Sequence, residues 1–105
     1  MERKNLFSKK MIGEEKKEYC LDYSLLMHST EYGNVYGIEI RKTANKTVVE
    51  SDRVEGVSER MEEAEYLLRK LAEGLATPVE LASLCDDYIS EREYVGIEEY
   101  AEAAS

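Results

Sequence analysis

The chain has 105 residues, of which 43% are hydrophobic and 35% charged, and its formal net charge is −9. This length fits one globular domain and leaves no room for a second of ordinary size. The acidic charge repels phosphate groups, so we expect neither a nucleic-acid partner nor an anionic membrane surface, and the lack of an apolar run of about 18 residues predicts no transmembrane helix.

The first 16 residues are basic and show little periodicity. Four basic residues flank only two apolar ones, Leu6 and Phe7, so no signal-peptide hydrophobic region follows. We expect residues 1–16 to be the mobile leader of a cytoplasmic protein. In that compartment Cys20 and Cys85 are reduced thiols, and their wide separation shows no metal-site spacing.

Three segments then show the pattern of β-strands. Residues 19–28 alternate between two faces, one of them apolar, as in a strand with one buried face. Residues 35–42 form a second strand and residues 47–54 a third, in which Val48 and Val49 point to opposite faces and leave the register open. The short polar connections predict an antiparallel meander in the order 1-2-3.

After these strands the hydrophobic period changes to that of an α-helix. Apolar residues recur three or four positions apart from Val54 to Leu75, which predicts an amphipathic helix. Ser58 is the expected N-cap, and the glutamates that follow it suit the positive end of the helix dipole. Gly74 is the expected C-terminal stop.

The segment around Pro78 predicts the start of a second helix. Thr77 and Glu80 have the spacing of a capping box, and Pro78 suits the first helical position. We expect this helix to run to about Ser90. Residues 77–90 contain no Lys or Arg, which argues against a DNA-reading helix–turn–helix.

These elements predict an α+β fold, with a three-stranded antiparallel β-meander followed by two α-helices packed on one face. The expected domain spans residues 17–90. Residues 91–105 form an acidic tail, which we expect to be partly disordered or a short helix.

Three short stretches carry a resemblance to a known family. They are Tyr36-Gly37-Ile38-Glu39-Ile40, Thr77-Pro78-Val79-Glu80-Leu81 and Asp86-Asp87-Tyr88-Ile89. On these stretches the sequence resembles a family of small uncharacterised proteins of Gram-positive bacteria, roughly over residues 17–90. The resemblance implies a shared fold and carries over no catalytic residue, because the family has no assigned activity.

Candidate catalytic residues are few. His28 is the only histidine, and a pair with Cys85 or Cys20 would supply a thiol nucleophile and its base. Cys85 lies on the apolar face of its predicted helix, however, where a free cysteine packs as a small hydrophobe. Asp86 and Asp87 diverge by about 100° on a helix and make no paired-carboxylate site. We therefore predict no catalytic residue, metal site or cofactor.

Four of the eight tyrosines cluster around the first predicted hairpin, and aromatic residues with a polar end suit an interface. Because two helices cover only one face of a three-stranded sheet, we expect the other face and the sheet edges to be free for a partner or a second copy. The predicted interaction surface consists of Tyr19, Tyr23, Tyr32, Tyr36 and Leu26.

Three functional hypotheses follow. The favoured one is a small non-enzymatic protein-interaction or regulatory module, which binds another protein or forms a homodimer. The alternative is a small enzyme or ligand-binding domain that uses Cys85, His28 or Asp86 in a pocket between sheet and helices. The third is an acidic decoy for a nucleic-acid-binding protein, which requires carboxylates spaced along one surface.

Overall fold

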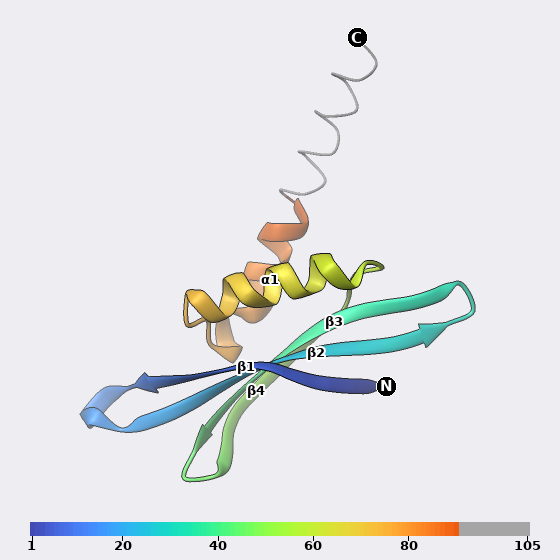
Figure 1. Cartoon of the computed structure of the whole chain (residues 1–105). Helices are drawn as coiled ribbons and strands as arrows, with labels where there is room; N and C mark the ends of the chain where they lie inside the picture. Colours follow the sequence, from blue (N-terminus) through green and yellow to red (C-terminus); the bar gives the residue numbers. More distant parts are fainter. Residues whose placement is uncertain (91–105) are drawn as a thin grey trace.

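The computed structural model describes residues 1–90, apart from the side chain of Glu14, and the predicted acidic tail lies outside the described residues. They form an α+β fold with one antiparallel sheet, in the order β1-β2-β3-β4, and helices on one of its faces (Figure 1). The strands are β1 (Glu2–Ile12), β2 (Glu18–Thr30), β3 (Gly33–Ala44) and β4 (Thr47–Ser58). The helix α1 (Met61–Glu73), the 3₁₀ turn η2 (Pro78–Glu80) and helical residues 81–90 follow.

The strand β1 corrects two predictions, the mobile leader over residues 1–16 and the three-stranded sheet. It pairs with β2 along its length, from Glu2 opposite Met27 to Ile12 opposite Glu18. A register shift at Leu6 interrupts its alternation of side chains, which hides the strand from a search for period two. The predicted domain start at residue 17 therefore falls inside the sheet rather than at its beginning.

The residues of β2 that are buried on one sheet face are those that the alternating sequence pattern placed on its apolar face. Leu21, Tyr23 and Leu25 are buried there, and α1 covers them with an apolar stripe. That stripe comprises Ala64, Leu67, Leu68, Leu71 and Ala72. The helical residues 81–90 add Leu81 and Cys85 to the same core. The two helical segments thus cover one sheet face, as the sequence predicted.

Two register shifts interrupt β4. One leaves Val49 without a partner in β3, between Glu50 opposite Lys42 and Val48 opposite Thr43, which explains why Val48 and Val49 left the register open. The other is a larger bulge near the end of the strand. Ile38 of β3 faces Val54, while Tyr36, two residues earlier, faces Ser58, so β4 carries two extra residues at this point. Gly56 lies in this bulge at a φ of 66°, a left-handed conformation that glycine adopts without strain. Val54 therefore belongs to a strand and not to the helical stripe in which the sequence pattern placed it.

The same bulge brings two backbones close together at Gly37. A Cβ atom on this residue would lie 2.5 Å from the carbonyl oxygen of Val54 and 2.9 Å from the Cα of Glu55. Both neighbours are backbone atoms, which cannot move aside as a flexible side chain can. The bulge therefore requires glycine at position 37.

The start of α1 lies later than predicted. Ser58 is the last residue of β4, and the N-cap of the helix is Arg60, which makes no side-chain capping bond. The Ser58 hydroxyl instead accepts a hydrogen bond of 3.0 Å from the backbone N–H of Arg60. The serine thus satisfies a donor at the strand–helix junction without being the N-cap.

The end of α1 has the hydrogen bonds of a Schellman motif. The N–H of Ala76 donates to the carbonyl of Leu71, and the N–H of Leu75 donates to that of Ala72. Gly74 is the C-cap, as predicted for a stop, but its φ is −88°. The left-handed residue is Leu75, at a φ of 52°, where glycine is usual.

The capping box predicted around Pro78 does not form. Thr77 is the N-cap of η2 but makes no side-chain bond to the backbone. Its hydroxyl donates to the Glu80 carboxylate over 2.9 Å, while the Glu80 N–H donates to the Thr77 carbonyl. A 3₁₀ turn therefore opens the second helical segment through backbone bonds.

The left-handed conformation of Leu75, in the turn after α1, yields a stability prediction. Leu75→Gly relieves the left-handed conformation of a residue that has a Cβ, so we expect the free energy of unfolding to rise by about 0.5–1 kcal/mol. Urea unfolding followed by circular dichroism measures this. Leu75→Ala is the matched control, since it shortens the side chain but keeps the strain. Equal stability of the two variants would contradict the strain at this position.

Candidate functional site

The structure does not bring together the predicted cysteine–histidine pair. Cys85 is fully buried in the core, whereas His28 is exposed near the end of β2. By the alternation of β2, His28 points to the face that the helices leave uncovered. Burial, together with the charges of Asp86 and Asp52, raises the pKa of the Cys85 thiol to about 11. The enzyme hypothesis thereby loses this nucleophile.

The acidic pair on the second helical segment makes no site either. Asp86 and Asp87 are both exposed, as expected for adjacent residues on a solvated helix face. Among residues 1–90, no group of three or more His, Cys, Asp or Glu side chains is placed to hold a metal ion.

The five residues of the predicted interaction surface do not share one surface. Tyr23 is fully buried, and its hydroxyl donates a hydrogen bond of 2.8 Å to the Ala76 carbonyl. Leu26 is buried too, on the opposite sheet face. Tyr19 and Tyr36 are half-buried, and only Tyr32 is fully open to solvent, with 96% of its surface exposed. Tyr23 and Leu26 are therefore structural residues, because tyrosine spacing along a strand does not distinguish core from surface.

The β2–β3 hairpin is the part of the tyrosine cluster that is accessible. It reaches beyond the N-terminal end of α1 as a two-stranded arm (Figure 1). Residues 28–34 are all exposed, and Tyr32 lies at the turn. Near the base of the arm lies a hollow of about 190 Å³. Its lining combines apolar side chains, among them Met27, Tyr36 and Met61, with the charged residues Glu2, Arg3 and Lys4 of β1.

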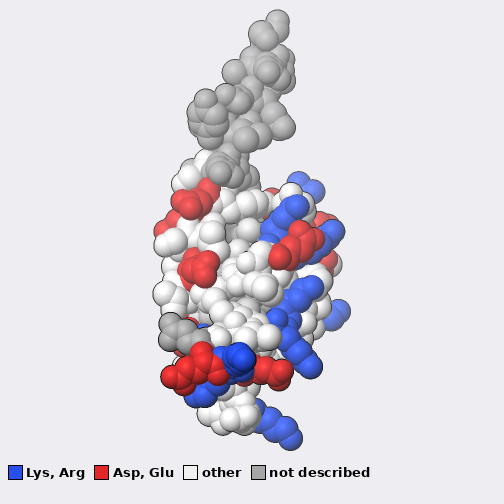
Figure 2. All heavy atoms as spheres, turned by 90° about the vertical axis from the view of Figure 1, so that its left-hand side faces the viewer, with Lys and Arg blue, Asp and Glu red and all other residues white. Residues whose placement is uncertain are grey.

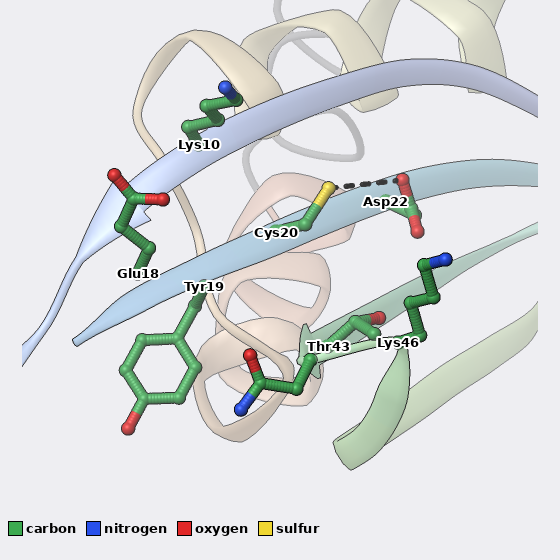
Figure 3. Close-up of a pocket in the computed structure, with 8 residues that line it drawn as sticks. Lys10, Glu18, Tyr19, Cys20, Asp22, Thr43 and Lys46 are labelled. Carbon is green, nitrogen blue, oxygen red and sulfur yellow. Dashed lines mark hydrogen bonds between the residues drawn. The ribbon is translucent and has the colours of Figure 1, made fainter.

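A second hollow lies at the other end of the sheet (Figure 3). Its volume is about 310 Å³, and Cys20 lies in it between its two register partners, Lys10 of β1 and Thr43 of β3. The lining also includes Glu18, Tyr19, Asp22, Asn45 and Lys46. Sequence reasoning missed this group because β1 was not recognised as a strand, so Lys10 had no predicted neighbour.

The surroundings of Cys20 in this hollow favour the protonated thiol over the thiolate. Its Sγ donates to Asp22 Oδ1 over 3.7 Å (Figure 3). Asp22 also accepts from the Ser8 hydroxyl over 2.6 Å. Partial burial and the Asp22 carboxylate raise the pKa of Cys20, and Lys10 offsets this only in part. The thiolate needed for nucleophilic chemistry is therefore disfavoured.

The sheet face that the helices leave uncovered, which we expected to be free for a partner, is polar at its centre. Glu39 lies at the centre of this face and is 7% exposed, and its carboxylate pairs with two arginines. Arg3 Nη1 lies 3.0 Å from Glu39 Oε1, and Arg41 Nε lies 2.9 Å from the same oxygen. The Glu39 carboxylate thus offsets one of the two arginine charges, and this group of ion pairs makes the centre of the face polar.

Comparison with known protein families assigns the chain to one of them. The model of a family of unknown function, DUF6514, matches residues 2–91. The chain belongs to the DUF6514 family. The DUF6514 match includes β1, which agrees with the four-stranded sheet rather than with a leader. No curated protein and no solved structure matches the chain. Within the described part of this DUF6514 chain, no helix is long and apolar enough to span a membrane.

The two thiols give a labelling prediction. In the folded chain at pH 8 we expect iodoacetamide to leave Cys85 unmodified and to modify Cys20 more slowly than a free-thiol peptide, because burial raises both pKa values. Mass spectrometry of samples taken at short times measures both rates. Urea, which exposes Cys85, is the positive control. A Cys85 that reacts as fast as the peptide would restore the nucleophile hypothesis.

The buried tyrosine and cysteine give a pH prediction. Burial raises the pKa of Tyr23 from 10.0 to about 12 and that of Cys85 from 9.0 to about 11. The folded chain keeps these protons at a pH where the unfolded chain loses them, so stability is full below about pH 9 and falls as the pH rises toward 12. Urea unfolding at a series of pH values measures the fall. Tyr23→Phe should cost about 1 kcal/mol at neutral pH by removing the bond to Ala76, and should reduce the fall above pH 10.

Proposed function

We propose that this chain is a small non-enzymatic protein-interaction module and that the β2–β3 hairpin is part of its contact surface. The observation that carries the proposal is the exposure of this arm. Residues 28–34 are solvent-exposed and Tyr32, at the tip, is 96% exposed. A two-stranded hairpin without a covering layer gains little stability on its own, so contact with a partner would stabilise it.

The chemistry of the arm suits protein recognition. Tyrosine is enriched in interfaces because it combines a large apolar ring with a polar end. Beside the arm, the hollow lined by Met27, Tyr36 and Met61 can accept an apolar side chain. Methionine adapts its shape to a partner more readily than branched residues do.

The thiol chemistry supports the non-enzymatic part of the proposal. Catalysis by Cys85 would require access to a residue that is fully buried, and Cys20 is held as a protonated thiol beside Asp22. Both cysteines are free, which is typical of a reducing compartment. We accordingly propose a cytoplasmic protein that acts through a protein partner, without a cofactor.

Site-specific photo-crosslinking tests this function. A photoreactive phenylalanine analogue in place of Tyr32 should give one discrete adduct in the native host, and Tyr32→Ser should compete poorly with the wild type for the same partner. The same analogue in place of Glu62, which is exposed on α1, is the matched control. Absence of any adduct from position 32, or the same adduct from both positions, would refute a contact surface on the arm.

A further inference from the structure

The two edges of the sheet carry opposite charges. The strand β1 contains four basic residues and one acidic residue, a net charge of +3, and β4 contains three acidic residues and one basic residue, a net charge of −2. Each of these strands has one hydrogen-bonded neighbour in the described sheet. In Figure 2, most of the Lys and Arg side chains in view gather along one side of the molecule.

Interruptions in both edge strands limit the length over which a further strand could pair. In β1 the register shift at Leu6 leaves Phe7–Ile12 as a regular segment. In β4 the shifts around Val49 and Gly56 leave residues 50–54 as a regular segment. The two regular segments have similar lengths. The bulges that flank them and the charged side chains within them oppose non-specific pairing with other strands.

We propose that β1 of one chain pairs with β4 of a second copy, so that the sheet continues from one molecule to the next. This inference rests on the proposed interaction function and names a second copy as a partner. Because every neighbouring pair in the sheet is antiparallel, β1 runs antiparallel to β4. A second copy in the same orientation therefore continues the alternation and keeps its helices on the same side.

We call this pairing of β1 with β4 of a second copy the β1–β4 joint. The side chains of the two strands favour one register for it. Lys9 lies opposite Leu21 and Asp52 lies opposite Ile40, so both point to the helix-covered side. Antiparallel pairing of Lys9 with Asp52 of the second copy sets opposite charges side by side. The same register places Phe7 opposite Val54, and both are half-buried residues at the margin of the core. The joint therefore extends the core as well as the sheet.

Pairing of like edges is disfavoured by the same charges. A two-fold β1–β1 pair centred on Lys9 sets this lysine against its own copy. A two-fold β4–β4 pair centred on Ser51 sets Glu50 against Asp52 of the copy, and one centred on Asp52 sets this residue against itself. The contact is therefore head-to-tail, which closes into a ring or continues as a chain of molecules.

Charge exchange tests the joint. We expect sedimentation velocity over the micromolar to millimolar range to show association that weakens with added salt. Lys9→Glu and Asp52→Lys should each weaken it by about fivefold, since each replaces an attraction by a repulsion. Lys9→Glu combined with Asp52→Lys in one chain keeps the wild-type net charge and restores the opposite-charge pair, so association should return.

The matched control is Arg69→Glu on the exposed side of α1, which changes the net charge as Lys9→Glu does and should leave association unchanged. Circular dichroism confirms that each variant folds. A chain that stays monomeric throughout, or an association that Lys9→Glu weakens no more than Arg69→Glu does, overturns the β1–β4 joint. Failure to regain association in the double variant also overturns this register. If the monomeric chain still gives the discrete adduct from position 32, self-pairing fails and the proposed function stands.

Discussion

The contact between Tyr23 and the turn after α1 joins the two layers of this protein. Tyr23 projects from β2 into the core, where it is fully buried, and its hydroxyl reaches the carbonyl of Ala76. Ala76 is itself the residue that closes the Schellman motif. A buried hydroxyl needs such a partner, and this bond adds about 1 kcal/mol to the apolar contacts that hold the helical layer on the sheet. The left-handed Leu75 lies next to it and is held by the same contacts.

Because the helical layer covers only one face, the remaining surfaces of the sheet have to be stable in water. The uncovered face achieves this with ion pairs around Glu39 and hydrogen bonds around Asp22. The edges achieve it with charges and bulges. Residues 1–58 contain as many basic as acidic residues, so the net charge of −9 belongs entirely to residues 59–105. The sheet is thus electrically balanced as a whole, and its two edges differ in sign.

Several local predictions failed for one common reason. Val54 fits a helical period only because a β-bulge changes the spacing of the strand. Ser58 and Thr77 have the residue types of helix caps, but each makes a different bond from the predicted one. Tyr23 and Tyr32 are the same residue type near one hairpin, yet one is fully buried and the other 96% exposed. In each case the residue types and their spacing fit more than one backbone geometry, and the folded backbone selects one of them.

The sequence by itself determined the α+β class, the alternation of β2, the apolar stripe of α1 and the structural role of Cys85. These features follow from hydrophobic periodicity, which can be recognised within one segment of the sequence without knowing which other segments pack against it. Only the tertiary structure decided that β1 exists and which of the tyrosines are accessible. Both depend on contacts between distant segments: β1 becomes recognisable beside β2, and Tyr23 is buried beneath the helical layer, where its hydroxyl binds the Ala76 carbonyl.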